Sequence, residues 1–368
     1  MKKDYDFLIV GAGITGIVLA RELDAIGKKV LLIDKKDHIG GNCYDYADER
    51  TGILIQKYGP HIFHTKNEAV FNYLKRFCEF NDYKHKVIAF YDGEYYPIPI
   101  NLETVNKFYL KQINSSEELK DFLEEKREKI VEIKNSEDVV VSKFGKELYE
   151  AFVKDYTKKQ WDKYPSELDK SVLERLPIKY DKDPYYFPGQ WQGMPIQGFT
   201  KMFENMLRNT GVEIMLETSF FQLDKDISYN FAIYTGPIDE FFNNKFGKLQ
   251  YRSITFDLEY HDEDYQPNSV VNYPDKNVKF SRITEFKKFY ELPDGETVIY
   301  RETFNWGGEP SYPLFDNTNK ELLSKYLEEA NSLKNVFFAG RLGRYKYLDM
   351  DKAVEEALDL FNKTLKSL

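Results

Sequence analysis

A chain of 368 residues with 42% hydrophobic content is long enough to form two or three domains, each with its own core. Its net charge of −9 argues against a general nucleic-acid-binding protein, although a local arginine cluster can still serve a phosphorylated small molecule. No apolar run is long enough to span a membrane and no signal-peptide pattern follows the N-terminus, so we expect a cytoplasmic protein without an integral membrane segment. The two cysteines, Cys43 and Cys78, form no CxxC pair and give no indication of a thiol redox centre.

The chain opens with the pattern of a strand, a helix and a second strand. The segment DFLIVGAG is typical of a short buried strand, ITGIVLARELDAIG has apolar residues at helical spacing, and KKVLLID again indicates a buried strand. Gly11, Gly13 and Gly16 complete a GxGxxG turn, whose bare backbone lets a pyrophosphate approach the N–H groups at a helix N-terminus. Asp34 follows the second strand, where its carboxylate can accept hydrogen bonds from a ribose diol. The pattern predicts a dinucleotide-binding site.

Helical spacing dominates the next part of the chain. From about Glu68 to Lys159, the segments NEAVFNYLKRFCEF, SSEELKDFLEEKREKIVEI and SKFGKELYEAFVKDYTKKQW predict a helical insertion. In the second segment, Ser115 or Ser116 is expected to cap a helix with an exposed, charged face, and we assign that helix no further role.

Strand patterns return in the second half of the chain. The segment FTKMFENMLRNTGVEIMLETSF predicts a helix followed by a strand, and FAIYTGP predicts another strand of the same sheet. Between about Tyr251 and Tyr300, the segments YRSITFDLEY, SVVNYP, FSRITEFKKF and ETVIYRET alternate in the manner of antiparallel strands. The final segment, KNVFFAGRLGRYKYLDMDKAVEEALDLFNKTL, predicts a strand, a glycine turn and a long helix.

Two further glycine elements favour FAD over NAD as the dinucleotide. HIGGN, with Gly41 and Asn42, follows the acidic residue at once, and VFFAGRL places Gly340 and Arg341 between a buried strand and the last helix. Together with the first glycine turn, these elements resemble the FAD-binding pattern of the glutathione-reductase and amine-oxidase structural class. The sequence contains no second GxGxxG, so a separate nicotinamide domain is not indicated.

We therefore expect an α/β fold in which a discontinuous Rossmann-like FAD-binding domain carries an inserted helical bundle and an antiparallel β-sheet domain. The FAD-binding domain is predicted to comprise residues 1–79, 194–240 and 316–368, and the helical insertion residues 80–175. The antiparallel sheet, as the substrate domain, is assigned residues 176–193 and 241–315, with a mobile lid near residues 165–182.

Six motifs follow one another along nearly the whole chain. They are YGPHIFHT (residues 58–65), YTKKQW (156–161), LERLPIKY (173–180), YTGPID (234–239), SRITEFKKF (281–289) and GRLGRYKYLDMD (340–351). In these motifs the chain resembles the UDP-galactopyranose mutase family. The resemblance implies an isomerase that interconverts UDP-galactopyranose and UDP-galactofuranose without net oxidation, supplying furanose sugar for cell-surface polysaccharide. In the mechanism attributed to the family, N5 of reduced FAD attacks the anomeric carbon as UDP leaves, and the sugar recloses from a flavin-iminium adduct.

The resemblance also assigns roles to individual residues. Arg175 and Arg282 match two arginines that bind the substrate diphosphate, and guanidinium groups suit this task because they bind phosphate oxygens bidentately. These arginines, with His64 and Tyr347, are the residues expected to act in catalysis. The residues expected to bind the nucleotide sugar are Phe152, Tyr156, Thr157, Trp161, Tyr186, Phe187, Asn272, Tyr312, Asp349 and His85. The residues expected to bind FAD are Gly11, Gly13, Ile14, Thr15, Gly16, Asp34, Lys35, Gly41, Asn42, His61, Gly340, Arg341 and Met350.

Some of these residues also have a purely structural interpretation. Phe152 and Tyr156 lie one helical turn apart, and they either stack on uracil or belong to a core. Asp349 either binds ribose, sugar or an arginine, or caps the helix that follows it. No metal site is expected at His61 and His64, because no further Cys, His or carboxylate lies at ligand spacing.

Three positions depart from the family pattern. Pro60 precedes HIFHT, His85 stands where an asparagine is usual, and Phe286 replaces a frequent histidine. These changes leave the flavin and diphosphate chemistry intact but do not fix which sugar is bound. The nucleotide sugars dTDP-fucose and UDP-N-acetylgalactosamine are therefore alternative substrates. An FAD-dependent amine or polyol oxidase, and a nucleotide-sugar-binding protein without turnover, are further alternatives. The reductant of the flavin is open, with transient binding of NAD(P)H or another donor, and family members are often homodimers.

Overall fold

The computed structural model describes residues 3–174, 176–188 and 191–368. By its internal contacts the chain separates into two compact units. Unit 1 contains residues 1–83, 189–250 and 318–368, and unit 2 contains residues 84–188 and 251–317. The expected α/β fold, with a Rossmann-like nucleotide domain and a largely antiparallel sheet, is confirmed. The division into three domains and the mobile lid stay predictions, and Arg175 lies outside the described residues.

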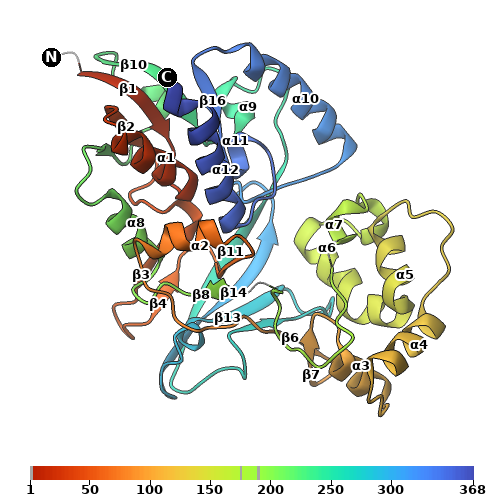
Figure 1. Cartoon of the computed structure of the whole chain (residues 1–368). Helices are drawn as coiled ribbons and strands as arrows, with labels where there is room; N and C mark the ends of the chain where they lie inside the picture. The colour runs from red at the N-terminus through yellow and green to blue at the C-terminus, as the bar shows by residue number, and fades with distance from the viewer. Residues whose placement is uncertain (1–2, 175, 189–190) are drawn as a thin grey trace. The chain divides into compact units, whose positions relative to one another are not determined.

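Unit 1 is built on a five-stranded parallel sheet with the strand order β16-β10-β1-β2-β9 (Figure 1). Its strands are β1 (Lys3–Val10), β2 (Val30–Ile33), β9 (Glu213–Met215), β10 (Ile227–Tyr234) and β16 (Val336–Phe338), with two small antiparallel pairs formed by β3 (Asp45–Ala47) and β4 (Leu54–Gln56), and by β5 (Phe63–Thr65) and β8 (Trp191–Gly193). Its helices are α1 (Ile14–Ala25), α2 (Glu68–Lys75), α8 (Phe199–Leu207), α9 (Ile238–Phe241), α10 (Asn317–Ser332), α11 (Gly340–Gly343) and α12 (Met350–Lys363). All four residues of β2 are buried, which is typical of a parallel strand covered on both faces.

Helix α1 connects β1 to β2 and packs against both α12 and α8. Its buried residues run in an almost unbroken series from Thr15 to Ala20, so the first turns of the helix are enclosed on most sides. Because this packing holds α1 firmly, its N-terminus at Ile14 is fixed directly after the glycine turn. The strand, turn and helix predicted from the first part of the sequence are confirmed.

Unit 2 contains a seven-stranded sheet with the strand order β15-β11-β14-β13-β12-β6-β7, antiparallel except for the pair β12–β6. Its strands are β6 (Val87–Tyr91), β7 (Glu94–Ile98), β11 (Tyr251–His261), β12 (Val270–Asn272), β13 (Arg282–Glu285), β14 (Thr297–Asn305) and β15 (Tyr312–Pro313). Its helices are α3 (Leu102–Tyr109), α4 (Ser116–Lys126), α5 (Ser136–Tyr149), a π-helical turn (Glu150–Lys154), α6 (Asp155–Trp161) and α7 (Ser171–Glu174). The sheet brings residues from both of the chain segments of unit 2 onto adjacent strands.

The expectation of helices throughout residues 68–159 is wrong for one segment. Val87–Tyr91 and Glu94–Ile98 form β6 and β7, an antiparallel hairpin at the edge of the unit 2 sheet. Asp92 and Gly93 make its two-residue turn, with φ values of 49° and 80°, the left-handed values that such a turn requires. An Asp-Gly pair between aromatic and β-branched residues is the sequence signal that identifies this hairpin.

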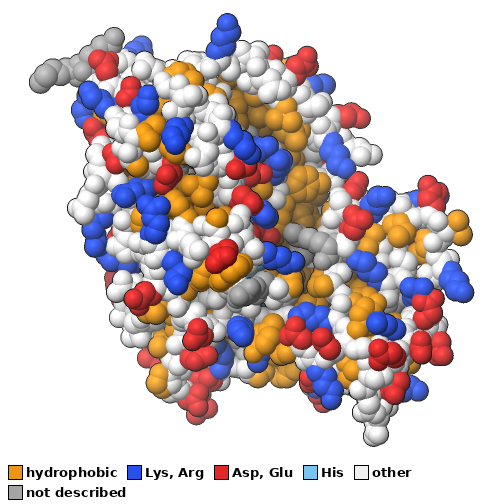
Figure 2. Space-filling model, viewed as in Figure 1, with side chains coloured by type: hydrophobic (Ala, Val, Ile, Leu, Met, Phe, Trp, Pro, Cys, Tyr) orange, Lys and Arg blue, Asp and Glu red, His pale blue; other side chains and the backbone are white. Residues whose placement is uncertain are grey.

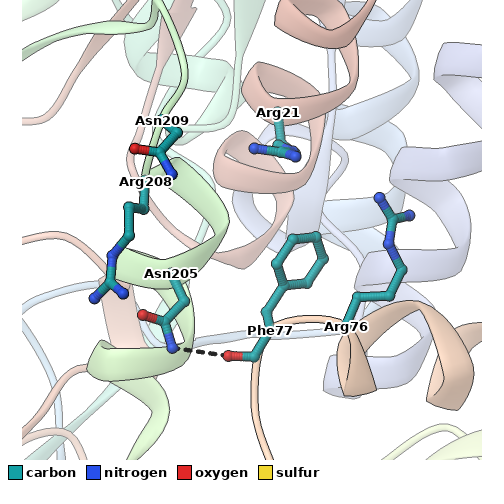
Figure 3. Close-up of a pocket in the computed structure, with 6 residues that line it drawn as sticks. All are labelled: Arg21, Arg76, Phe77, Asn205, Arg208 and Asn209. Carbon is teal, nitrogen blue, oxygen red and sulfur yellow. Dashed lines mark hydrogen bonds between the residues drawn. The ribbon is translucent and has the colours of Figure 1, made fainter.

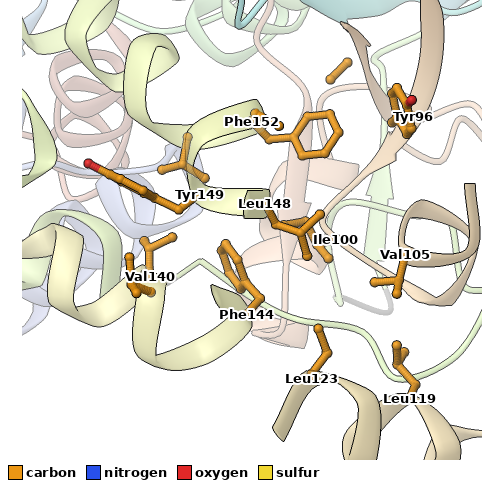
Figure 4. Close-up of a cluster of buried hydrophobic side chains, with 14 of the residues drawn as sticks. Tyr96, Ile100, Val105, Leu119, Leu123, Val140, Phe144, Leu148, Tyr149 and Phe152 are labelled. Carbon is orange, nitrogen blue, oxygen red and sulfur yellow. The ribbon is translucent and has the colours of Figure 1, made fainter. Parts of the chain in front are cut away.

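The helices of unit 2 pack around one hydrophobic core (Figure 4). Phe144, Leu148 and Phe152 lie in this core with Leu119 and Leu123 of α4. The opposite face of α4 is charged and exposed, as the sequence indicated. The expected cap is also present, because the hydroxyl oxygen of Ser115 accepts a hydrogen bond from the third residue of the helix at 3.1 Å.

Phe286 also belongs to the interior of unit 2. Residues 286–289, which the sequence suggested as strand, form a 3-10 turn directly after β13. The Phe286 side chain is fully buried and contacts Tyr300 edge-on, with ring centroids 5.0 Å apart. The structure therefore gives Phe286 a packing role.

The surface carries charges of both signs. On the face drawn in Figure 2, acidic and basic side chains are interspersed, and basic ones gather over the part of unit 1 where Figure 1 places α1, α2 and α8. Among the described residues, none of the helices combines the length and the apolar character needed to cross a membrane.

Candidate functional site

The glycine turn of unit 1 brings two backbone segments into direct contact. Gly11 has a left-handed φ of 106°, and a Cβ there would lie 2.0 Å from the hydroxyl oxygen of Thr235. A Cβ on Gly41 would lie only 2.9 Å from the Cα of Gly13. Since α1 begins at Ile14, its first N–H groups and the positive end of its dipole lie at this side-chain-free turn. The arrangement suits the pyrophosphate of a dinucleotide.

The Asp34 carboxylate, directly after β2, is tied to the same turn. Its Oδ2 accepts a hydrogen bond from the Ala12 N–H at 2.7 Å, and its Oδ1 accepts one from the Lys36 N–H at 2.9 Å. Each carboxylate oxygen can accept a second hydrogen bond, so the group retains capacity for a ribose diol. Lys36 Nζ donates to Asn42 Oδ1 at 3.4 Å, which brings the second glycine element beside the acid, whereas Lys35 is exposed.

The last glycine element packs against the start of α1. Gly340 has a left-handed φ of 74°, and a Cβ there would lie 3.3 Å from the Thr15 hydroxyl oxygen. Arg341 donates from Nη2 to the Leu348 carbonyl at 2.7 Å, and its guanidinium carbon lies 5.4 Å from the centre of the Tyr347 ring. Three glycine elements that are distant in sequence therefore gather at the N-terminus of α1.

His64 lies near the start of α12. This helix begins at Met350, and Asp349 occupies its N-cap position, although the Asp349 carboxylate makes no capping hydrogen bond. The capping interpretation of this side chain is therefore wrong. Burial lowers the pKa of His64, while the carboxylates of Asp349 and Asp351 oppose the shift. Because burial has the larger effect, the imidazole of His64 is neutral at pH 7.

His61 is fixed through its backbone. The Gln56 side chain accepts a hydrogen bond from the His61 N–H at 2.5 Å and donates one to the His61 carbonyl at 2.9 Å. The Nδ1 atom of His61 lies 2.8 Å from the Gly59 carbonyl, which can only accept, so the proton is on Nδ1. Across residues 3–174, 176–188 and 191–368, no group of three or more His, Cys, Asp and Glu side chains is arranged to hold a metal ion.

Unit 2 contains an arginine–glutamate pair on neighbouring strands, in which the glutamate is buried and the arginine side chain is 21% exposed. Arg282 of β13 lies opposite Glu302 of β14, with Nε of the arginine 3.2 Å from Oε2 of the glutamate. Glu302 is 1% exposed, and its Oε1 accepts a hydrogen bond from the Thr284 hydroxyl at 2.9 Å. Burial raises the pKa of Glu302, against the opposing effect of Arg282. Burial by itself would lower the pKa of Arg282, but the Glu302 carboxylate overcomes this and keeps the guanidinium charged.

Several predicted site residues surround this pair. Tyr156 of α6 donates a hydrogen bond to Asn272 Oδ1 at 3.1 Å, and Asn272 lies opposite Arg282 in the sheet. Burial raises the pKa of Tyr156 to about 12, Arg282 opposes this rise, and Tyr186 and Tyr312 also interact with it electrostatically. The phenol of Tyr156 therefore stays protonated and can donate. Four residues predicted from sequence are therefore brought together around the positive charge of Arg282.

His85, Tyr186 and Phe187 form a second aromatic group. The His85 ring stacks on Phe187 with centroids 5.4 Å apart, and it meets Tyr186 edge-on at 5.9 Å. The Tyr186 N–H donates to the His85 carbonyl at 2.7 Å. The two remaining predicted residues of α6 differ in exposure, since Thr157 is buried and Trp161 is partly exposed.

Phe152 lies in the hydrophobic core of unit 2. Its ring centroid is 5.1 Å from that of Tyr96 and 5.5 Å from that of Phe108. These contacts give the ring a packing role, while its predicted contact with a nucleotide stays a prediction.

Sequence reasoning missed two residues that support this site, Glu302 and Lys159. Lys159 Nζ donates to the main-chain carbonyls of Tyr273, Asp275 and Phe280, at 2.7, 2.6 and 3.2 Å. These carbonyls belong to the loop between β12 and β13, so one ammonium group ties α6 to the two strands that carry the predicted ligands. No local signal distinguishes it from other lysines of the helix.

Replacement of Lys159 by methionine is expected to lower the free energy of unfolding by about 1–3 kcal/mol, because the loop carbonyls lose their shared donor. The loop would also hold Asn272 and Arg282 less firmly, so KM for the substrate should rise. The matched control is Lys158→Met, which removes a lysine paired with Asp162 at the surface. Urea unfolding and steady-state kinetics measure both variants, and equal effects in the two would contradict this role.

The chain is similar in sequence and in structure to proteins of known family. The family model described as UDP-galactopyranose mutase matches residues 151–347, and that of an NAD(P)-binding Rossmann-like domain matches residues 9–77. The chain is 42% identical to a probable UDP-galactopyranose mutase of Klebsiella pneumoniae, over 99% of this chain and 95% of the relative. It is 36% identical to a dTDP-fucopyranose mutase of Escherichia coli, over 98% of each chain. A crystal structure of reduced UDP-galactopyranose mutase superposes with a TM-score of 0.79 at 18% identity, covering 99% of this chain and 96% of the other.

Proposed function

Because this chain belongs to the UDP-galactopyranose mutase family of flavin-dependent isomerases, we propose that it interconverts UDP-galactopyranose and UDP-galactofuranose without net oxidation. FAD is the proposed cofactor, and its reduced form is the proposed active state. The glycine turn and Asp34 support a dinucleotide, because side chains at Gly11 or Gly41 would collide with Thr235 or Gly13, and glycine keeps this tight turn at the α1 N-terminus free of side chains.

The observation that carries the proposal is the pair of Arg282 and buried Glu302 with Tyr156 and Asn272 beside it. When UDP leaves the sugar, negative charge develops on its diphosphate and must be stabilised. A guanidinium group that is already held in place can stabilise this charge without first changing its position. The protonated phenol of Tyr156 can turn its one O–H from Asn272 Oδ1 to a phosphate oxygen, without adding repulsive charge. Arg175 is proposed as the second arginine on the diphosphate.

The flavin contributes the nucleophile when it is bound, since N5 of the reduced ring can attack the anomeric carbon. The chain's part is to hold the pyrophosphate at α1, the ribose at Asp34 and the nucleotide sugar at the residues of unit 2 named above. Neutral His64 is proposed to hydrogen-bond to the flavin or the sugar, and Tyr347 to act near the reacting groups. These roles are assigned through the family and are proposals for this chain.

A second candidate substrate is dTDP-fucopyranose, because the relative at 36% identity carries the name dTDP-fucopyranose mutase. The higher identity of the probable UDP-galactopyranose mutase favours UDP-galactose as the substrate. UDP-N-acetylgalactosamine is the third candidate. A galacto-configured ring is common to all three, so discrimination depends on contacts to substituents of the sugar and the base.

We expect dithionite-reduced enzyme under anaerobic conditions to convert UDP-galactofuranose to UDP-galactopyranose, because reduction gives N5 an available electron pair. Chromatography of the nucleotide sugars measures the conversion, with the dTDP-fucose and N-acetylgalactosamine compounds tested in parallel. The control is the air-oxidised enzyme, which should be inactive. Equal turnover by the oxidised enzyme contradicts the proposed mechanism. Oxygen consumption by the enzyme when a substrate is added would instead support an oxidase.

Two predictions about partners accompany this proposal. The flavin would be reduced by NAD(P)H or another donor that binds transiently, and the chain would form a homodimer. Anaerobic titration with NADPH and sedimentation of the purified protein test them separately from turnover.

A further inference from the structure

A pocket of about 400 Å³ on unit 1 is rich in arginine (Figure 3). The residues that line it are Arg21, Arg76, Phe77, Asn205, Arg208 and Asn209. They come from the middle of α1, the end of α2 and the end of α8. Arg21 lies roughly 12 Å along α1 from the glycine turn at Gly13, so the pocket is separate from the proposed pyrophosphate site.

The arginines of the pocket have no direct ion-pair partners among the described residues. Within the described parts of the chain, Arg21, Arg76 and Arg208 form no ion pair with a carboxylate. Two acids lie nearby without pairing directly with these arginines: Glu22 accepts a hydrogen bond from the Tyr73 hydroxyl at 2.8 Å, and Asp24 accepts one from the Gly211 N–H at 2.8 Å. Both donors are neutral, so both carboxylates keep their negative charge. Three positive charges line one concavity in a protein whose net charge is −9.

The side chains of the pocket are held in place by packing. The Phe77 ring lies between two guanidinium groups, 5.7 Å from that of Arg21 and 5.2 Å from that of Arg76. Arg21 also donates from Nη1 to the Met206 carbonyl at 3.2 Å, and Asn205 Nδ2 donates to the Phe77 carbonyl at 2.9 Å. The Arg21 guanidinium, held in this way, loses little further conformational freedom when it binds an anion, whereas Arg76 and Arg208 are exposed.

The deeper polar groups of the pocket are incompletely satisfied. Arg21 Nε and Asn205 Oδ1 are both buried and have no hydrogen-bond partner. Buried polar atoms of proteins nearly always have a partner, and an exception calls for an explanation such as a site built for a polar ligand. Arg21 Nε is a donor that an anion oxygen can satisfy, and this observation is independent of the number of charges. Asn205 Oδ1 is an acceptor and gives no indication of an anion.

We propose that this pocket binds a small phosphate-bearing anion. Arginine forks bind phosphate oxygens bidentately, and the volume is in the range of small-molecule sites rather than of flat macromolecular interfaces. The shared chemistry is a phosphate group with two negative charges, whether it belongs to a nucleotide or to a sugar phosphate. This site is additional to the FAD and nucleotide-sugar sites, and it does not depend on the proposed function.

The test uses the FAD-loaded full chain, pyrophosphate as the probe and the double variant Arg76→Gln/Arg208→Gln, in which both changed residues are exposed in the folded protein. Calorimetry at constant ionic strength, with saturating UDP to occupy the diphosphate site proposed at Arg282, should show that pyrophosphate binds the variant about 10-fold more weakly or worse, because two charge-assisted hydrogen-bonding groups are lost. The matched control is Arg50→Gln, which removes an exposed arginine between β3 and β4 and should bind as the wild type does.

Chemical modification provides a readout at the residues themselves. Pyrophosphate should slow the reaction of phenylglyoxal with Arg76 and Arg208 in the wild type, as mapped by mass spectrometry, and should leave Arg50 as reactive as before. AMP and glucose 6-phosphate, tested in the same way, identify a nucleotide or a sugar phosphate as the better ligand. Equal affinity in all three proteins, absence of protection, or an acidic peptide that binds more tightly than pyrophosphate would each overturn the proposal.

Discussion

Replacement of Arg282 by methionine is expected to lower the free energy of unfolding by about 3–5 kcal/mol, because Glu302 is left as a buried charge without its partner. Glu302 is 1% exposed, so water cannot substitute for the guanidinium. Turnover at saturating substrate should fall by roughly 10²–10³-fold, the range found when one group that stabilises developing charge is removed. Urea unfolding followed by circular dichroism and the anaerobic mutase assay measure the two effects.

The pH dependence of the Arg282→Met variant has a definite sign. Burial already raises the pKa of Glu302 in the folded chain above its ordinary value of 4.5, and loss of Arg282 raises it further. The folded variant then binds a proton that the unfolded chain releases, so its stability falls as pH rises above the ordinary carboxyl range and recovers below it. We therefore expect a smaller stability deficit at pH 5 than at pH 8.

Two controls separate stability from chemistry. Arg282→Met/Glu302→Leu removes both charges and should recover most of the lost stability while staying inactive. Arg301→Met is the matched control on the neighbouring strand pair β11–β14, because Arg301 of β14 forms a bidentate pair with the partly exposed Glu259 of β11, at 2.5 and 3.0 Å. Its loss should change stability by ~1 kcal/mol or less and leave turnover unchanged. A double variant as unstable as the single one would show that the buried charge is not the cause.

The sequence predicts well those parts of the fold that are determined by residues close to one another along the chain. The glycine turn, α1 and β2 lie within one short segment, where apolar period and glycine spacing identify strand, turn and helix directly. The same holds for β9, β10 and β16 and for the long helix α12, all of which are confirmed. Helix α10 was not predicted, because only Asn319 and Tyr326 of its residues are buried and its apolar stripe is too thin to detect.

The supporting part of the candidate site could not be predicted because it depends on strand register. Glu302 becomes the partner of Arg282 only because β13 and β14 pair in a register that places them opposite each other. A shift of one residue would place Arg301 there instead and would turn Glu302 to the other face of the sheet. Lys159 likewise acquires its role from a loop more than a hundred residues away along the chain. The family resemblance predicted the substrate-binding residues of this region, but no local pattern in the sequence predicted the residues that support them.

Replacement of Gly16 by alanine is expected to remove the dinucleotide site altogether. A Cβ on Gly16 would lie 1.9 Å from the carbonyl oxygen of Gly11 and 3.1 Å from its carbonyl carbon, and a backbone atom cannot rotate away as a side chain can. Relief requires α1 to move from β1, which disturbs packing against α8 and α12 and should cost about 3 kcal/mol or more. The flavin content per chain, measured by absorbance after heat release, should then fall about 10-fold or more, because the N-terminus of α1 no longer meets the turn.

The other end of the same helix offers the matched control. Gly27 has a left-handed φ of 80°, and a Cβ there would meet nothing within 4 Å. Gly27→Ala should therefore cost only about 1–2 kcal/mol of backbone strain and keep the flavin content of the wild type. If Gly16→Ala retained its flavin as well, close contact between helix and strand would not be what forms the site. If both variants lost it, general destabilisation of the nucleotide domain would be the cause rather than the geometry of the turn.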